Sequence, residues 1–456
     1  MPKAFRNQGI EFRAMKWAVR HPGMVSVPTG LAAAAAEGVM TLGAPTTGAL
    51  AGGVALGLAG WYRGHPASFD AVALPRLRAF RRRWLTYVGR RWADILTDCE
   101  LITVNRRTDQ VQVPRIVRVT AASPSIDTIT VRLNRGQTPT VFEERAEALA
   151  HALRAERVAV MRVRPQVVAL VVERCNPFDS DPIPAIDIPH TSAEVDLSAL
   201  ELGDTEYGTP WTLPLIGNHL FGAGATGSGK SALLWNPLRA MAPMLRDGVV
   251  QVDMVDMKEG METEVGAPLF HRRAIDFAES VEVIEGFRDE MKERQALLRQ
   301  QGTRRFTPSV ETPFRVLQID EMGMMTGFGP SKEVRDVLRL LAEIMTQGRA
   351  PGFAVCGYVQ EPTKDTVGVR DLFTQRVCLS VTTQGHVDMV LGEGMRLRGA
   401  LADEIPLGDD YAGTGFVVRA RSRTPQRVRA FYQSDDDIHD LVAFVTGDRP
   451  RLHAVA

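Results

Sequence analysis

A glycine-rich segment at residues 224–231, with the sequence GATGSGKS, constrains the fold of this chain more than any other feature. Apolar runs at residues 211–216 and 219–221 precede it, and a helical stretch opens at Ala232 directly after it. Strand, loop and helix follow in the order of a phosphate-binding loop, whose glycines let backbone N–H groups surround phosphates at a helix N-terminus. The segment predicts an α/β motor domain of the P-loop NTPase class, built on a mostly parallel sheet.

The last two residues of this segment carry its charge and its hydroxyl group. Lys230 is expected to contact the β- and γ-phosphates of ATP, and Ser231 to offer its hydroxyl to Mg²⁺. The other members of the predicted nucleotide site are Gly224, Ala225, Thr226, Gly227, Ser228 and Gly229. ATP and Mg²⁺ are therefore the predicted cofactors.

Two further apolar runs end in polar residues that suit the same chemistry. The run at 314–319 leads into Asp320 and Glu321, and the run at 353–359 leads into Gln360. Asp320 is expected to hold Mg²⁺ through water, and Glu321 to orient and deprotonate the attacking water. Gln360 is placed to sense the γ-phosphate. The acid pair predicts ATP hydrolysis rather than nucleotide binding alone.

The N-terminal part of the chain is weakly charged and apolar over residues 23–62, where Glu37 is the only charged side chain. Residues 24–40 and 42–62 approach the length that a membrane-spanning helix needs, and basic residues flank the pair on both sides. We predict a two-helix transmembrane hairpin in the cell membrane, with both flanks in the cytoplasm. A soluble hairpin rich in alanine and glycine is the alternative.

Arginines and aromatic residues alternate over residues 76–92, which predicts a basic amphipathic helix beside the membrane. Contact with nucleic acid and a plain solvated helix face are the alternatives. Short β-branched runs at 116–120, 128–133, 158–163 and 167–172 surround one helical stretch, which Thr140 and Glu143 are expected to cap. This pattern predicts a small α+β adaptor domain.

These features divide the chain into seven predicted parts. In order, they are a basic cytoplasmic N-terminus (1–22), the hairpin (23–62), the juxtamembrane helix (63–100), the adaptor domain (101–175), a proline-rich linker (176–207), the motor domain (208–434) and a C-terminal tail (435–456).

Charge and cysteine content exclude some classes of protein. Lysine plus arginine (54) equals aspartate plus glutamate (54), so total charge does not indicate a nucleic-acid partner. The four cysteines lie far apart, without a CxxC pair, which argues against a zinc site and against a disulfide-stapled secreted fold. A reducing cytoplasm suits them.

Several segments together resemble the FtsK/SpoIIIE family of DNA-pumping ATPases, over roughly residues 208–432. They are the Walker A segment (219–231), an acid-x-lysine signature (Asp256, Met257, Lys258), the helix before the Walker B strand (290–294), the end of that strand (319–322), the segment with a trans-acting arginine (348–353, containing Arg349), a sensor turn (Gln360, Pro362) and the closing portion (376–392). In the sensor turn, Val359 and Glu361 replace the usual threonine and arginine.

The resemblance implies a RecA-like motor that forms a ring, expected to be a hexamer, around double-stranded DNA. Each ATP would lie between subunits, with Lys230, Ser231 and Asp320 from one and Arg349 from its neighbour. The layout is similar to transfer proteins of mycelial Gram-positive bacteria, which implies movement of plasmid or integrative-element DNA in conjugation, with other transfer proteins as partners. Chromosome segregation, protein secretion, a nucleotide-dependent membrane scaffold and a small-molecule kinase are the alternatives.

Overall fold

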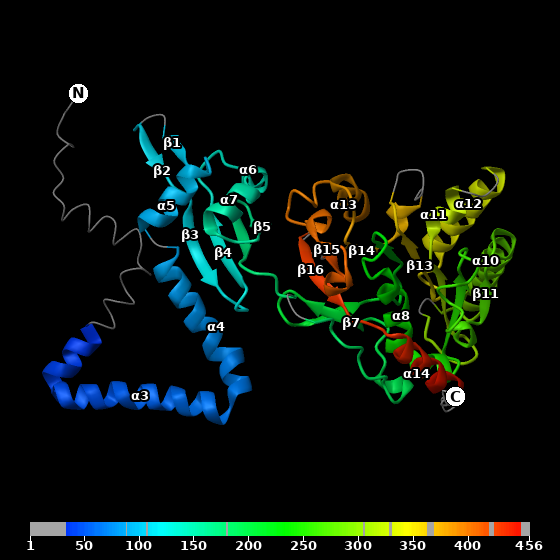
Figure 1. Ribbon diagram of the computed structural model, residues 1–456, viewed down its shortest axis with the longest axis horizontal. Coiled ribbons are helices and arrows are strands. Elements are labelled where there is room, and N and C mark those ends of the chain that lie inside the picture. Colours follow the sequence, from blue (N-terminus) through cyan, green and yellow to red (C-terminus); the bar gives the residue numbers. More distant parts are fainter. Residues whose placement is uncertain are drawn as a thin grey trace. The chain divides into compact units, whose positions relative to one another are not determined.

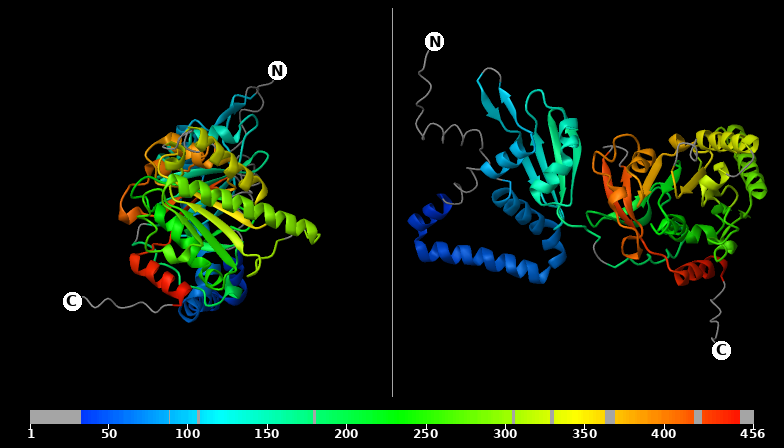
Figure 2. Two further views of the ribbon diagram at one scale, coloured as in Figure 1. Left: turned by 90° about the vertical axis from the view of Figure 1, so that its right-hand side faces the viewer. Right: turned by 45° about the horizontal axis from the view of Figure 1, so that its top comes forward.

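The computed structural model describes residues 33–87, 89–105, 108–178, 181–303, 306–327, 331–362, 369–418 and 424–447. The predicted basic N-terminus (1–22) and much of the first predicted membrane span (24–40) lie outside these ranges. The chain divides into two compact units, residues 1–77 and 78–456, and each is described by itself. Figures 1 and 2 show the elements in their sequence colours.

In the first unit, a helix covers residues 33–42 and α3 covers Ala44–Gly64, followed by the start of α4 (Pro66–Leu85). Trp61 and Tyr62 of α3 pack edge-on against Phe69 of α4, and Trp61 Nε1 donates a hydrogen bond to Ser68 Oγ (2.7 Å). Alanine and glycine fill most of α3 and add little apolar surface. Among the described helices, none has the length and hydropathy for a membrane crossing, so the predicted transmembrane hairpin is not supported.

The second unit begins with a small α+β domain. Its described strands form one four-stranded antiparallel sheet in the order β3-β4-β6-β5, with a separate hairpin of β1 and β2. The bounds are β1 (Thr103–Asn105), β2 (Gln110–Gln112), β3 (Arg115–Thr120), β4 (Ile126–Arg132), β5 (Arg157–Arg164) and β6 (Val167–Glu173). All four runs predicted as strands in this region are strands. Helices α5 (Gly89–Asp98), α6 (Pro139–Glu144) and α7 (Ala146–Leu153) contribute to the apolar core on one face of the sheet.

Two sequence predictions for this domain are wrong. Trp92 and Leu96 of α5 are buried in the domain core, so the compact domain starts before residue 101 and α4 and α5 are not one juxtamembrane helix. The expected cap at Thr140 does not form, because Pro139 already occupies the first turn and Thr138 is the N-cap. Glu143 is buried there and forms an ion pair with Arg162.

The motor domain is built on a ten-stranded sheet in its described residues, in the order β11-β10-β12-β13-β9-β14-β15-β16-β7-β8. The strands are β7 (Leu200–Thr205), β8 (Pro210–Leu213), β9 (Leu220–Ala223), β10 (Val250–Val255), β11 (Arg272–Ala274), β12 (Phe314–Ile319), β13 (Phe353–Val359), β14 (Gln375–Leu379), β15 (Thr414–Val418) and β16 (Pro425–Ala430). Strands β11 to β14 in this order are parallel, and β15, β16, β7 and β8 continue the sheet antiparallel.

Helices cover both faces of this sheet, because successive strand residues are apolar on both sides. The core on one face is shared with α10, α12 and α13, and the core on the other face with α8, α9 and α14. Helices α10 and α12 lie side by side (Figure 1). The bounds are α8 (Lys230–Ala240), α9 (Ala242–Arg246), α10 (Phe277–Gln300), α11 (Met322–Gly327), α12 (Ser331–Gln347), α13 (Gln384–Leu391) and α14 (Asp435–Thr446).

The α/β class predicted for the motor domain is confirmed, and three finer predictions need correction. The sheet is mixed rather than mostly parallel, since four of the nine strand pairings in its described residues are antiparallel. The predicted linker contains β7, whose Leu200 and Leu202 are buried in the motor core. The predicted C-terminal tail contains α14, which a capping box of Ser434 and Asp437 starts and which buries Ile438 and Leu441.

A buried ion-pair network joins the small domain to the motor domain within the second unit. Arg157 of β5 binds Glu173 of β6 (Nε–Oε2, 2.7 Å), Glu206 after β7 (Nη2–Oε2, 2.5 Å) and the Gly399 carbonyl oxygen (2.9 Å). Arg427 of β16 forms a second ion pair with Glu173. We call these four charged residues the junction network.

Candidate nucleotide site

The glycine-rich loop has the geometry that its sequence predicts. It connects β9 to α8, and Gly227 (φ 81°) and Gly229 (φ 83°) are in the left-handed region that favours glycine. The Gly413 N–H donates a hydrogen bond to the Ser228 carbonyl oxygen (2.8 Å), and a Cβ at Gly229 would overlap the Gly413 nitrogen. The residue before β15 therefore packs against the loop and stabilises its conformation.

The acid at the end of β12 lies directly against this loop. Lys230 Nζ donates to Asp320 Oδ1 (2.6 Å) and to the Asp320 carbonyl oxygen (2.8 Å). Lys258 Nζ lies 3.0 Å from Asp320 Oδ2. Burial alone would raise the pKa of Asp320, but the charges of Lys230 and Lys258 hold it below its ordinary value. Asp320 is thus a buried carboxylate between two ammonium groups.

The neighbouring Glu321 has a different environment. Its two carboxylate oxygens accept from the Gln360 backbone N–H (3.2 Å each), and burial raises its pKa. The Gln360 side chain in turn accepts a hydrogen bond from Thr226 Oγ1 in the loop (3.4 Å). Two adjacent carboxyl groups with pKa values shifted in opposite directions suit two roles, a fixed anion and a proton acceptor.

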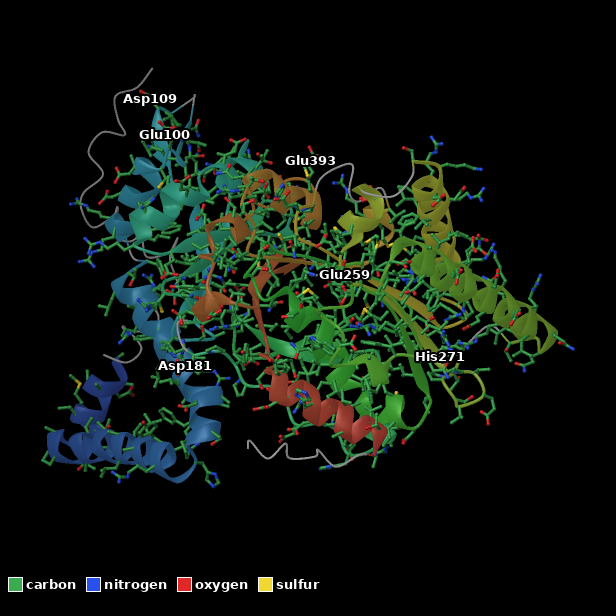
Figure 3. The ribbon with its side chains drawn as sticks, turned by 45° about the vertical axis from the view of Figure 1, so that its right-hand side comes forward. Glu100, Asp109, Asp181, Glu259, His271 and Glu393 are labelled. Atoms are coloured by element: carbon green, nitrogen blue, oxygen red, sulfur yellow. The ribbon has the colours of Figure 1, made fainter. Side chains whose placement is uncertain are left out.

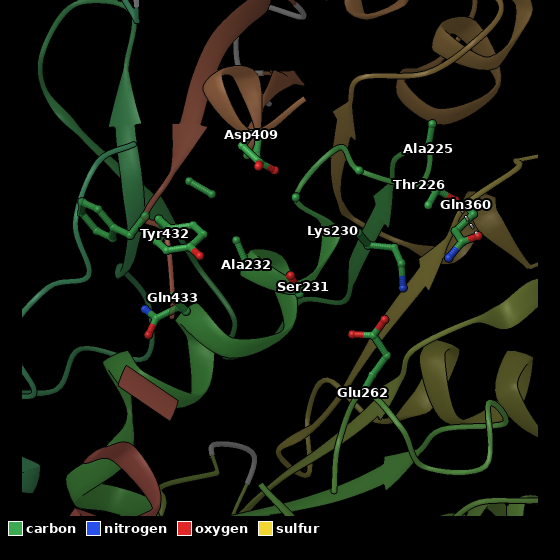
Figure 4. Close-up of a pocket in the computed structure, with 16 residues that line it drawn as sticks. Ala225, Thr226, Lys230, Ser231, Ala232, Glu262, Gln360, Asp409, Tyr432 and Gln433 are labelled. Atoms are coloured by element: carbon green, nitrogen blue, oxygen red, sulfur yellow. Dashed lines mark hydrogen bonds between the residues drawn. The ribbon is translucent and has the colours of Figure 1, made fainter. Parts of the chain in front are cut away.

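A cavity of about 260 Å³ opens beside the loop. Figure 4 shows Lys230, Gln360 and Glu262 at one part of it, and Asp409, Tyr432 and Gln433 at another. Tyr432 and Gln433 follow β16, far from the loop in sequence, and Tyr432 is half exposed. An exposed aromatic ring at the edge of a nucleotide cavity can stack on a base. No local motif marks these C-terminal residues, so sequence analysis missed them.

Sequence analysis also left Lys258 without a role, although the acid-x-lysine signature contains it. Asp256 fixes the turn around it by accepting from the Lys258 backbone N–H (3.1 Å) and from Thr263 Oγ1 (2.8 Å). The next residue, Glu259 (Figure 3), has a left-handed backbone (φ 57°). The turn after β10 thus aims Lys258 at the acid on the neighbouring strand.

Arg349 does not join the other candidate residues. It precedes β13, whereas the loop and Gln360 follow the ends of β9 and β13, two parallel strands in register. The seven residues of β13 put about 20 Å between the two edges of the sheet. Arg349 is exposed, and its Nε donates to the Gly217 carbonyl oxygen (2.6 Å). This arginine cannot reach the nucleotide site of its own subunit.

The residues present fit a magnesium ion bound together with phosphates. No cluster of three or more histidine, cysteine or acidic side chains that could hold a metal occurs in the described part of the chain. Mg²⁺ in phosphate-transfer sites needs only one or two protein ligands besides phosphate and water. Asp320, which already holds two cationic groups, and the hydroxyl of Ser231 in the cavity wall supply such a pair.

Comparison with known proteins gives two family matches. Residues 73–174 match the actinomycete conjugal transfer protein N-terminal domain, and residues 190–352 match the FtsK/SpoIIIE family. The first match covers the small domain and part of α4. The second covers the glycine-rich loop, the acid pair and Arg349.

Curated relatives are similar over part of their length. The DNA translocase FtsK of Halalkalibacterium halodurans is 24% identical over 301 residues, which are 59% of this chain and 35% of the relative. That of Bacillus cereus is 25% identical over 262 residues, 51% of this chain and 30% of the relative. The chain thus spans about a third of the length of these relatives.

Among solved structures, the fold is similar to the pCW3 conjugation coupling protein TcpA in its monomer form with ATPγS. The TM-score is 0.52 at 17% identity, with 79% of this chain and 99% of that chain covered.

Proposed function

Because this chain carries an ATPase domain of the FtsK/SpoIIIE family behind a conjugal transfer N-terminal domain, we propose that it hydrolyses ATP to move double-stranded DNA in conjugative transfer. The observation that carries the proposal is the contact of Lys230, which lines the loop cavity, and of Lys258 with Asp320, the residue before Glu321. The two family matches support DNA as the cargo and conjugation as the occasion.

Each residue of the site has one task in this proposal. The loop amides and Lys230 bind the ATP phosphates, which draws the Lys230 ammonium away from Asp320. Ser231 and Asp320 would hold Mg²⁺, which would neutralise charge on the phosphates. Glu321 orients the attacking water and accepts its proton, as its raised pKa favours. Gln360 links Glu321 to the loop, so a change at the phosphates reaches the base.

Arg349 acts in trans. Its position at the opposite edge of the sheet excludes a role in its own site, and its exposure leaves it accessible to a neighbouring subunit. A guanidinium supplied by a neighbour stabilises the charge of the transition state. The proposed assembly is therefore a closed ring, a hexamer, in which each site is incomplete without the next subunit.

The proposal places the protein at the cytoplasmic membrane, with the motor domain in the cytoplasm and other transfer proteins as partners. The support is the basic sequence on both sides of the weakly charged residues 23–62. Cell fractionation with an alkaline carbonate wash tests this part. Recovery of the chain in the soluble fraction would overturn it.

Steady-state ATP hydrolysis by the full chain, with and without duplex DNA, tests the function. We expect stimulation by duplex DNA that is lost in Lys230→Ala and in Arg349→Ala. A rate of ATP hydrolysis that does not change with duplex DNA would still support an ATPase but would contradict the translocase function.

A mixing experiment tests the shared site. Lys230→Ala subunits keep an intact Arg349, and Arg349→Ala subunits keep an intact loop, so mixed rings contain some complete sites. We expect an equal mixture to hydrolyse more ATP than either variant alone. Activity equal to the mean of the two variants would contradict the trans role.

A further inference from the structure

A row of arginines crosses the four-stranded sheet of the small domain. Arg115 of β3 lies opposite Arg132 of β4, Arg132 lies opposite Val167 of β6, and Val167 lies opposite Arg164 of β5. Residues directly opposite on antiparallel strands project from the same face. All three arginines are exposed. With strands spaced by about 4.8 Å, the row is about 14 Å long.

Two bulges in the outer strands build this row. In β3 the register shifts between Ile116 and Arg118, so Arg118 pairs with Thr130 and faces the same way as Arg115. In β5 the shift between Arg162 and Arg164 turns Arg162 to the helix face, where it pairs with Glu143, and turns Arg164 outward. Strict alternation would have put Arg162 and Arg164 on one face.

Helices α5, α6 and α7 lie on the face of the sheet opposite the arginine row. On the face with the arginine row, the motor domain packs against one end. The core shared with α5, α6 and α7 contains Ile116, Val131 and Val168. In their strands these residues are neighbours of the row's residues and project from the opposite face. At the far end of the outward face, Ala159 and Val171 pack with Tyr207 of the motor domain. On the rest of this face the arginine side chains are exposed, and Val167 between them is buried.

The salt bridges of the described residues leave these arginines out. Among the described residues, Arg115, Arg118, Arg132 and Arg164 have no ion-pair partner, whereas arginines on the helix side do, as in Arg162 with Glu143. Four unpaired guanidinium groups on one open face repel one another and attract an anion.

Helix α4 carries further arginines, of which Arg83 lies close enough to Arg115 to be affected by its charge. Arg78 Nε and Nη1 and Arg83 Nη1 are buried without a hydrogen-bond partner in the described part of the chain. Burial, and then the charge of Arg115, lowers the pKa of Arg83. Arg83 therefore adds positive charge beside Arg115.

We propose that the open sheet face with Arg115, Arg118, Arg132 and Arg164, called here the arginine face, binds the phosphate backbone of duplex DNA. Guanidinium groups recognise phosphates by paired hydrogen bonds. A row of about 14 Å is long enough to reach phosphates on both sides of a major groove about 12 Å wide. Exposed aromatic side chains, which anchor proteins at a lipid surface, are absent from the paired positions of this face.

This inference rests on the proposed function and deepens it, because it gives the translocase a second contact with DNA outside the motor domain. Phosphate contacts carry no sequence information, so the arginine face would hold DNA of any sequence. It would keep DNA near the motor while the ATPase ring releases and rebinds it.

The test uses the full chain with Arg118→Gln, Arg132→Gln and Arg164→Gln combined. The matched control removes three exposed arginines elsewhere, Arg154→Gln, Arg335→Gln and Arg339→Gln. Fluorescence anisotropy of a labelled 30-base-pair duplex gives the affinity over a series of salt concentrations. We expect the arginine-face variant to bind at least about tenfold more weakly at low salt, with a salt slope smaller by about 2.7 for three lost phosphate contacts.

Each outcome decides the question. The same affinity and slope in both variants would overturn the arginine face, and DNA-stimulated hydrolysis by the wild-type chain would then still support the translocase. Absence of DNA binding by the wild-type chain would overturn both. Flotation with phosphatidylglycerol vesicles is the second arm, and loss of vesicle binding with DNA binding intact would assign the face to lipid instead.

Discussion

Replacing Arg157 by methionine tests whether the junction network holds the small domain on the motor domain. Arg157 and Glu206 are each 3% exposed and Glu173 is fully buried, so the network is shielded from bulk water. Glu173 keeps its ion pair with Arg427, whereas among the described residues Glu206 is left with the Arg427 backbone N–H (3.2 Å). Removing one partner of a buried pair costs about 3–5 kcal/mol, because the other charge stays buried and unpaired.

The assay is urea unfolding of the full chain at pH 7.5, followed by far-UV circular dichroism. We expect Arg157→Met to lower the free energy of unfolding by about 3–5 kcal/mol, and Glu206→Gln in the same chain to restore about 1–3 kcal/mol by removing the unpaired charge. Burial already raises the pKa of Glu206, so the defect of Arg157→Met should also shrink as the pH falls and Glu206 takes up a proton.

A loss below about 1 kcal/mol, the value of an exposed pair, would refute the reasoning, since it would mean that the network is open to water. The matched control is Arg145→Met, which removes an exposed arginine of the same domain from its ion pair with Glu100. That change should cost less than about 1 kcal/mol.

Three further predictions concern the motor domain. Burial lowers the pKa of His219 from 6.5 to about 4, so the unfolded chain binds a proton that the folded chain refuses; His219 stabilises the fold above pH 6.5 and that contribution falls as the pH drops, by about 2 kcal/mol at pH 5. Unfolding at pH 7.5 and 5.0 should show that loss in the wild type and not in His219→Asn, and equal slopes would contradict it. Glu321→Gln should bind a fluorescent ATP analogue normally and hydrolyse ATP at least about 100-fold more slowly, because it removes the base; unchanged turnover would exclude that role. Lys258→Met should lower the Mg²⁺ concentration that half-saturates binding of the analogue, since Lys258 competes for Asp320; an unchanged value would contradict the competition.

The candidate site residues that the structure brings together follow from local sequence patterns. A glycine-rich loop between a strand and a helix fixes its own conformation, so Lys230 and Ser231 lie where the motif puts them. Asp320, Glu321 and Gln360 follow strands that are parallel and adjacent, so their side chains meet at one edge of the sheet. Their catalytic roles stay predictions.

The local sequence pattern did not predict secondary structure in segments whose burial depends on partners far away in the sequence. Residues 200–205 contain two acidic side chains and a glycine, which looks like linker, yet β7 pairs with β16 more than 200 residues later. Helix α14 follows the last apolar strand and has three acidic residues in its first turn, but it packs on α9. Both segments gain their order from a surface that only the folded motor domain provides.

The arginines of β5 show most clearly that local sequence does not predict burial, because three of them have three different environments. Arg157 is buried between two glutamates, Arg162 is turned to the helices by a bulge, and Arg164 two residues on is left exposed. Each of the three has a valine directly beside it in the sequence, so the apolar pattern around them does not separate them. What separates them is the register shift at Val163 and the carboxylates that reach β5 from α6 and the motor domain. An even balance of charge over the whole chain therefore hides an arginine face, and only the pairing of the strands reveals it.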